Sequence, residues 1–271
     1  MSATPPVALT IAGSDSGGGA GIQADLVTFA ALGVHGTSAI AALTAQNTVG
    51  VAGVHVPPIE FLRAQLDAVL DDLPVAAVKT GMLATAATVE VISALAAQGR
   101  LPHLVVDPVM VSSSGDRLLE PAAEKAYRDG LFPHAAVVTP NLREAEVLLG
   151  SPIRSRADQH AAARALGDLG AGAAVVKGGH PAGDPSNMAV DVVWDGKEVY
   201  ELRAPWVNTP NTHGTGCSFA AATAALLAQG DDLRTALASA KDFVTRAIAG
   251  GARWHLGAGH GPLDHFGWPV S

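Results

Sequence analysis

The sequence is poor in cysteine, in charged residues and in long apolar runs. It has one cysteine, so no internal disulfide bond can form, which fits a reducing compartment. Charged residues make up 15% of the chain and the net charge is −8, which argues against a nucleic acid or an anionic membrane as partner. No apolar run reaches the roughly 18 residues of a membrane span, and the first residues show no signal-peptide pattern. We therefore expect a cytoplasmic globular protein.

Apolar, strand-type segments alternate with alanine-rich, helix-type segments. Short continuous apolar runs suit strands that are buried on both faces of a sheet. We predict strands at Val7–Ala12, Ser38–Thr44, Val75–Val78, Leu104–Val106, Ala135–Val138 and Ala173–Val176. Helices are predicted between them at Ile22–Leu32, Ile59–Leu73, Thr85–Gln98, Pro121–Asp129, Asn141–Leu149 and Arg156–Leu169. This repeated pattern predicts an α/β fold with a mainly parallel sheet and helices on both faces.

The last third of the chain departs from this alternation. Val190–Trp194 and Glu198–Leu202 flank Asp195-Gly196-Lys197, which predicts a late hairpin at an edge of the sheet. Two helices follow, at Cys217–Gln229 and Asp232–Gly250. Because no linker, low-complexity tract or internal repeat interrupts the 271 residues, we expect one domain spanning residues 1–271.

Polar or glycine-bearing groups follow six of the predicted strands. The carboxyl ends of parallel strands lie at one edge of a sheet, and ligands bind beyond that edge. We therefore expect one long cleft formed by residues 13–21, 46–48, 79–82, 107–110, 139–141 and 177–180.

The segment from Asn211 to Ser218 is rich in glycine and precedes a run of small residues that ends at Gly230. The run predicts a helix closed by a C-terminal glycine. The first amides of a helix lack internal acceptors and carry the positive end of the helix dipole. Gly214 and Gly216 leave room for an anion, so we interpret the segment as an anion hole that contains the thiol of Cys217. An ordinary turn before a buried helix is the alternative.

Two nucleotide motifs are absent. Gly19-Ala20-Gly21-Ile22-Gln23-Ala24 imitates a dinucleotide-binding fingerprint, but no acidic residue lies between Leu26 and Ile59 to hold a ribose. The only Gly-Lys pair, Gly196-Lys197, lies in the predicted hairpin, so there is no phosphate loop of the G-x-x-x-x-G-K-[ST] type. The first glycine loop is then either a flexible substrate cover or a plain turn.

Several polar residues are candidates for phosphate or metal binding, and some of them have an alternative structural role. Lys177 can meet a phosphate beside Gly178 and Gly179, or it can form a structural salt bridge. Asn141 and Glu144 can form a capping box, or reach a hydrated magnesium ion. A carboxylate such as Asp107 at the end of a buried strand needs a charged or polar partner. The late histidines His255, His260 and His265 lack a cysteine or carboxylate that would complete a familiar metal site.

Taken together, these strings resemble the hydroxymethylpyrimidine/phosphomethylpyrimidine kinases of thiamine biosynthesis, in the ribokinase-like superfamily. The resemblance covers nearly the whole chain. The matching segments are residues 9–15, 18–25, 79–83, 107–110, 114–116 (Ser-Gly-Asp), 139–141, 177–180, 211–217, 259–262 and 265–266. It implies a ribokinase-like three-layer α/β/α sandwich with a mainly parallel central sheet.

The resemblance also implies roles for individual residues. Gln46 is expected to hydrogen-bond an aminopyrimidine and Met82 to pack on its ring. The other substrate-binding residues are Gly13, Ala20, Asp25, Thr44 and Val109, with Asp25 and the first glycine loop near the hydroxymethyl end. Lys177, Asn141, Asp107 and Thr212 are expected to bind ATP, and Asp107 and Glu144 a magnesium ion, directly or through water. The expected catalytic residues are Gly214, Thr215, Gly216, Cys217 and Lys177.

The resemblance implies in-line transfer of phosphate from MgATP to 4-amino-5-hydroxymethyl-2-methylpyrimidine (HMP), and then to HMP phosphate, by a homodimer. Related kinases usually carry an aspartate where this chain has Cys217. A thiol at a helix N-terminus has a lowered pKa, so Cys217 can be a thiolate base, or it can serve only as scaffold for the helix amides. The alternatives to the HMP kinase are a pyridoxal kinase and a non-catalytic pyrimidine sensor, and the retention of Lys177 and Cys217 argues against the sensor.

Overall fold

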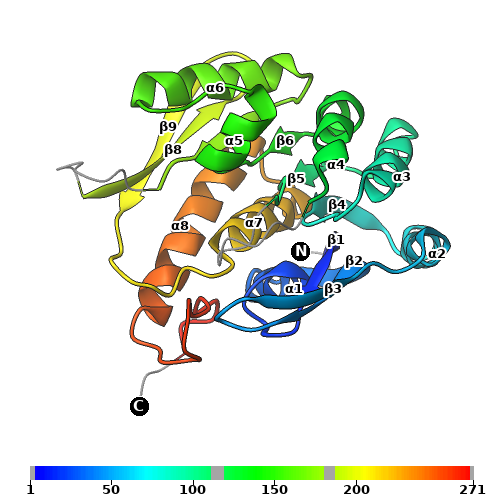
Figure 1. Cartoon of the computed structure of the whole chain (residues 1–271), viewed down its shortest axis with the longest axis horizontal. Helices are drawn as coiled ribbons and strands as arrows, with labels where there is room; N and C mark the ends of the chain where they lie inside the picture. The colour runs from blue at the N-terminus through cyan, green and yellow to red at the C-terminus, as the bar shows by residue number, and fades with distance from the viewer. Residues whose placement is uncertain (1–3, 111–118, 180–186, 269–271) are drawn as a thin grey trace.

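The computed structural model describes residues 4–110, 119–179 and 187–268. Two segments of the sequence resemblance, Ser114-Gly115-Asp116 and His180, lie outside these residues. One nine-stranded sheet runs through the described residues, in the order β3-β2-β1-β4-β5-β6-β7-β8-β9 (Figure 1). None of the described helices is both long and apolar enough to span a membrane.

The centre of the sheet is parallel, as the sequence predicts. Its strands are β2 (His35–Gln46), β1 (Val7–Asp15), β4 (Val75–Thr80), β5 (Val105–Val106), β6 (Val137–Val138) and β7 (Ala174–Lys177), each parallel to its neighbour. β1 is three residues longer than predicted, because Gly13, Ser14 and Asp15 still pair with β2. These extra residues carry backbone and side-chain groups into the cleft described below.

Antiparallel strands close both edges. The predicted hairpin is confirmed as β8 (Met188–Trp194) and β9 (Val199–Pro205), with β9 at the edge. At the other edge, β3 (Val51–His55) pairs with β2 and was not predicted. Four of its five residues are exposed, so it lacks the buried apolar face by which a strand is recognised in a sequence.

Helices cover both faces of the sheet, which confirms the three-layer architecture (Figure 1). One buried cluster joins one face of the sheet to α2 (Ile59–Leu70), α3 (Ala86–Ala97), α4 (Pro121–Ala126), α5 (Leu142–Leu149) and α6 (Arg156–Asp168). A second cluster joins the other face to α1 (Gly21–Ala31), α7 (Thr215–Gln229) and α8 (Leu233–Gly251). α7 is buried along most of its length, and its alanines let it pack closely on the sheet.

The helix predicted at Pro121–Asp129 differs in its second half. The α-helix ends at Ala126, and a π-helical turn (Tyr127–Leu131) and a 3-10 turn (Phe132–His134) continue the chain. These turns bury Tyr127 and Phe132 in the core, and the Tyr127 hydroxyl donates to the carbonyl of Gly81 over 3.2 Å. Pro133 has no N–H with which to continue an α-helical pattern.

Candidate active site

A cavity of about 160 Å³ lies where the parallel strands end, as the sequence predicts. Its wall contains groups from β1, β2, β4, β7 and the loops after β5 and β6, and from the N-terminus of α7. Of the candidate site residues, Gly13, Ala20, Thr44, Gln46, Met82, Asp107, Val109, Asn141, Glu144, Lys177, Thr212, Gly214, Thr215, Gly216 and Cys217 line it. A second cavity of about 520 Å³ adjoins the first and shares Lys177, Thr212 and Gly216 with it.

The N-terminus of α7 forms one wall of the first cavity. The helix begins at Thr215, two residues before the predicted start, and ends as predicted at Gly230 in the left-handed conformation. Its N-cap is Gly214, whose φ of 86° favours glycine, and a Cβ there would lie 1.9 Å from the carbonyl oxygen of Gly19. No side chain caps the helix. The Thr215 amide donates to the Thr212 carbonyl over 3.2 Å, so the amides of Gly216 and Cys217 are the ones that can face an anion.

The thiol of Cys217 differs from the sequence expectation. A lowered pKa was expected for a thiol at a helix N-terminus, but burial raises the pKa of Cys217 to about 11, and the Lys79 ammonium opposes this shift only in part. At neutral pH the thiol of the ligand-free protein is therefore protonated. Burial outweighs the helix dipole because removing an anion from water costs more than one helix end returns.

Lys177, Asp107 and Glu144 form a group of ionisable side chains. It lies beside the N-terminus of α7, since a Cβ on Gly216 would lie 2.9 Å from Lys177 Nζ. Lys177 Nζ lies 2.8 Å from Asp107 Oδ1, so the carboxylate at the end of the buried strand has the charged partner that the sequence analysis required. Burial lowers the pKa of Lys177, but Asp107 and Glu144 outweigh it and the pKa lies above its ordinary value. Burial raises the pKa of Glu144 to about 7, against the effect of Lys177. Lys177 is therefore charged at neutral pH, whereas Glu144 titrates there.

The capping box of Asn141 and Glu144 is confirmed. The Asn141 side chain accepts from the Glu144 amide over 2.9 Å, and Glu144 Oε2 accepts from the Asn141 amide over 2.8 Å. The capping box uses only Oε2 of the Glu144 carboxylate, and Oε1 takes no part in it. Both residues line the cavity, so the capping box and a role toward a hydrated ion are compatible.

The acidic pair fits a hydrated magnesium ion better than a directly ligated metal. No group of three or more His, Cys, Asp or Glu side chains that could hold a metal occurs among the described residues. Magnesium usually binds through one or two carboxylates, waters and substrate phosphates, and Asp107 and Glu144 are two such carboxylates.

The histidines of the C-terminal segment contact other groups. His265 Nε2 pairs with the Ser218 hydroxyl at 2.8 Å, and His260 Nδ1 lies 3.0 Å from the carbonyl of Pro210.

At the other end of the cavity, Gln46, Thr44, Met82 and Val109 form a partly apolar pocket. The Met82 side chain packs directly on the backbone of Gly13, where a Cβ would lie 2.4 Å from Met82 Cε. Glycine at position 13 therefore makes room for the thioether. Ala42, Met82 and Ala84 form a small buried cluster with Val109 packed against it, and Met82 and Val109 give this end of the cavity its apolar surface.

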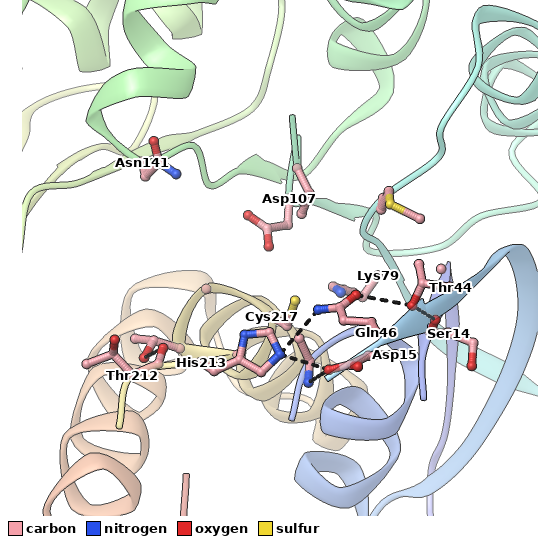
Figure 2. Close-up of a pocket in the computed structure, with 18 of the residues that line it drawn as sticks. Ser14, Asp15, Thr44, Gln46, Lys79, Asp107, Asn141, Thr212, His213 and Cys217 are labelled. Atoms are coloured by element: carbon pink, nitrogen blue, oxygen red, sulfur yellow. Dashed lines mark hydrogen bonds and ion pairs between the residues drawn. The ribbon is translucent and has the colours of Figure 1, made fainter. Parts of the chain in front are cut away.

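Asp25 does not line the cavity, contrary to the expectation that it contacts substrate. Its carboxylate is fully buried and forms an ion pair with Lys79 at 2.7 Å and a hydrogen bond with Thr10 Oγ1 at 2.6 Å. Burial lowers the pKa of Lys79, but Asp25 reverses the shift, so the ammonium stays charged. Lys79 in turn contributes to the cavity wall, near Cys217 in Figure 2. Asp25 thus acts on the site through Lys79.

Sequence reasoning also missed the pair of Asp15 and His213. His213 Nε2 lies 2.8 Å from Asp15 Oδ2 (Figure 2). Asp15 also accepts from the backbone amides of Gly17, Gly19 and Ala20. A carboxylate at the start of a glycine-rich loop is the signal that could have identified Asp15, because such residues accept hydrogen bonds from the amides of the turn that follows. No comparable signal links it to His213, which lies 198 residues away.

Comparisons with known proteins agree with this geometry. Residues 15–264 match the phosphomethylpyrimidine kinase family. The chain is 50% identical to the hydroxymethylpyrimidine/phosphomethylpyrimidine kinase of Streptomyces coelicolor, over 98% of this chain and 96% of that protein. It is also 50% identical to the thiamine biosynthesis bifunctional protein ThiED of Geobacter sulfurreducens, over 95% of this chain, but it spans only about half (51%) of that protein.

Solved structures show the same fold. The ADP complex of Bacillus subtilis pyridoxal kinase matches with a TM-score of 0.88 and 39% identity, over 97% of this chain and 98% of that one. Phosphomethylpyrimidine kinase from Clostridium difficile 630 matches with a TM-score of 0.78 and 37% identity, over 90% of this chain and 99% of that one. The expected fold class is confirmed, and the chain belongs to the phosphomethylpyrimidine kinase family.

Proposed function

We propose that this protein phosphorylates HMP to HMP phosphate with ATP, and then phosphorylates HMP phosphate to HMP diphosphate, in thiamine biosynthesis. The observation that carries the proposal is the near-complete match to the family and to a full-length relative that bears both kinase names. The cavity supports it, because one end is apolar with amide and hydroxyl groups and the other holds a lysine and free helix amides.

In this proposal the nucleotide occupies the second cavity and extends its phosphates into the first. Lys177, Thr212, Thr215 and Gly216 line both cavities, so a phosphate chain can pass between them. Lys177 then meets the phosphates as a point charge, with Asn141 beside it. The pyrimidine ring lies between Gln46 and Met82, which directs its hydroxymethyl group toward the start of α7.

The amides at the start of α7 stabilise the charge that develops on the transferred phosphoryl group, since that group passes through a loose, anionic transition state. Because Cys217 is protonated at neutral pH, we assign this stabilisation to the amides in the segment from Gly214 to Cys217, apart from that of Thr215, which donates to Thr212. A role for Cys217 as base is the competing hypothesis, and substitutions distinguish the two below.

Magnesium completes the proposed site. Asp107 and Glu144 would hold the ion through its waters, and the bound ion would supply neutralisation of phosphate charge. Removing divalent ions with EDTA should abolish ATP turnover, and added Mg²⁺ should restore it.

We also propose a single-domain, cytoplasmic homodimer. The support for association is apolar surface on β2 and near β3, where Leu43, Val49 and Val54 are exposed.

A pyridoxal kinase is the second candidate, and one observation favours it. The TM-score with Bacillus subtilis pyridoxal kinase, 0.88, exceeds the 0.78 with the phosphomethylpyrimidine kinase from Clostridium difficile. A non-catalytic sensor is the third, and it is opposed by Lys177 and the free α7 amides in one cavity.

ADP release measured separately with HMP, HMP phosphate and pyridoxal distinguishes all three candidates. We expect turnover with both pyrimidines and none with Lys177→Met. Turnover with pyridoxal alone would support the second candidate. No turnover, together with measurable HMP binding, would support the sensor.

A further inference from the structure

The amide of Gln46 lies between two polar groups that determine its orientation. Gln46 is the last residue of β2, and its Oε1 lies 3.1 Å from Thr44 Oγ1 on one side. On the other side its Nε2 lies 3.5 Å from His213 Nε2 (Figure 2). The oxygen and nitrogen ends of an amide have the same shape and exchange by a half-turn, so the hydrogen-bond partners decide which end faces which neighbour.

His213 Nε2 offers no acceptor to Gln46, because its one hydrogen is directed at Asp15. Its Nε2 lies 2.8 Å from Asp15 Oδ2, so one of these two atoms carries the shared proton. Burial raises the pKa of Asp15, but the hydrogen bonds from His213 and from the backbone amides of Gly17 and Ala20 outweigh it and bring the pKa below its ordinary value. Because Asp15 is an ionised acceptor, the proton belongs to His213 Nε2. That nitrogen therefore cannot accept a hydrogen bond from an amide N–H.

Thr44 presents an acceptor to Gln46. Its hydroxyl carries one proton, and the carbonyl oxygen of Ser14 lies 2.9 Å away and can only accept. Once that proton is directed at Ser14, Thr44 Oγ1 has only lone pairs left for Gln46. Both neighbours thus favour the same amide orientation, with the N–H end toward Thr44 and the C=O end toward His213.

We propose that His213, held by Asp15, is a positioning residue that orients the Gln46 amide and thereby selects which hydrogen-bonding edge of a substrate ring is accepted. The inference rests on the proposed role of Gln46 in binding the ring. In this orientation the amide offers the cavity an N–H on the Thr44 side and a carbonyl lone pair on the His213 side. A ring nitrogen beside an exocyclic amino group complements that pattern, whereas a ring N–H beside a carbonyl presents the opposite one.

The position of His213 is itself fixed from several sides. Its backbone amide donates to Gly261 O over 3.1 Å, and the ring packs on Gly19, where a Cβ would lie 2.5 Å from His213 Cδ2. His213 directly precedes Gly214, the N-cap of α7. The same residue therefore joins the ring-binding end of the cavity to the helix that faces the phosphates.

The test compares kcat/KM for HMP with kcat/KM for its 4-oxo analogue, in which the amino group is replaced by a carbonyl and the adjacent ring nitrogen carries hydrogen. The wild type should strongly prefer HMP, because the analogue leaves two polar groups of the site unpaired. His213→Phe keeps a ring of similar size but has no N–H. Its preference for HMP over the analogue should fall at least tenfold, with the KM for ATP unchanged within twofold.

His213→Gln retains an N–H that Asp15 can accept and should recover part of the preference. His255→Leu replaces an exposed histidine of the C-terminal segment and should behave as wild type. Thermal unfolding and the ATP KM show whether each variant is folded, and His213→Leu gives the same measurement if the phenylalanine variant does not fold.

Two outcomes separate this inference from the proposal on which it rests. If His213→Phe lowers kcat/KM for both substrates equally and leaves their ratio unchanged, His213 does not orient Gln46 and the inference is wrong. If Gln46→Ala leaves that ratio unchanged, Gln46 does not bind the ring and its proposed role fails. A collapse of the ratio in both variants, with ATP kinetics preserved, supports the inference.

Discussion

Replacing Gly216 with alanine should separate catalysis from stability. A Cβ at position 216 would lie 2.9 Å from Lys177 Nζ and 3.7 Å from Asp107 Oδ2. Only the first distance is too short, and it involves the far end of a flexible side chain. The lysine can therefore move away without disturbing the fold, but it then leaves the place where α7 and Asp107 meet, and where we propose that ATP phosphates bind.

The structure sets the size of both effects. Displacing Lys177 removes a hydrogen bond between charged groups, worth about 1.5–3 kcal/mol, which corresponds to a loss of about 10- to 150-fold in kcat/KM for ATP. Gly216 lies inside the first turn of α7 with ordinary helical geometry, so alanine should raise helix stability, by up to about 1 kcal/mol. The variant should be less active but still folded, because the gain in helix stability is offset as Lys177 moves away from the buried carboxylate of Asp107.

Gly230→Ala is the matched control in the same helix. Gly230 ends α7 with a φ of 96°, which disfavours alanine, but nothing lies within 4 Å of its Cβ position. This control should lose about 1 kcal/mol of stability and keep normal kinetics. Steady-state ADP release and thermal unfolding measure both properties for each variant. Normal kinetics for Gly216→Ala would refute the placement of Lys177 at the phosphates.

Three further predictions concern the charged groups of the site. Lys79→Met should lower the free energy of unfolding by about 3–5 kcal/mol in chemical denaturation, because it leaves the buried carboxylate of Asp25 unpaired; a change below 1 kcal/mol would contradict this. Cys217→Ser should keep kcat within about tenfold, because the thiol is protonated at neutral pH; a loss of 10²–10⁴ that Cys217→Asp recovers would instead identify Cys217 as the base. Glu144 has its pKa raised from 4.5 to about 7, so its contribution to stability is complete below about pH 4.5 and is lost as the pH rises through 7. Glu144→Gln keeps an acceptor for the Asn141 amide and should flatten the dependence of the melting temperature on pH over this range; an unchanged profile would count against that pKa.

The arrangement of the parallel strands could be predicted from the sequence, because strands buried on both faces are continuous apolar runs such as Ala173–Val176. The edge strand β3 could not, because an exposed strand is recognised by its pairing partner rather than by its own composition. For the helices too, features with a local sequence signal could be predicted and features set by tertiary packing could not. Gly230 marks the end of α7, whereas the π-helical turn after α4 depends on tertiary packing around Tyr127.

For the site, sequence predicted which segments meet but not how their charges pair. The strand ends converge as expected, since topology alone brings Gln46, Lys177 and Asp107 to one edge. The ion pair Lys79–Asp25 and the hydrogen bond Asp15–His213 link residues 54 and 198 positions apart, and no local pattern encodes such a partner. The raised pKa of Cys217 could not be predicted for a related reason, because the helix end is visible in the sequence while the burial that raises the pKa is not.

The most direct test of the central claim is ³¹P NMR of the reaction of HMP with MgATP. The γ-phosphate signal of ATP should decrease while a phosphate ester on the hydroxymethyl oxygen forms, and this monoester should then be converted to a diphosphate. Gly216→Ala should slow both steps, since both use the same phosphate-binding groups. If ATP is consumed only to inorganic phosphate, or if the pyrimidine stays unmodified while pyridoxal is phosphorylated, the account is contradicted.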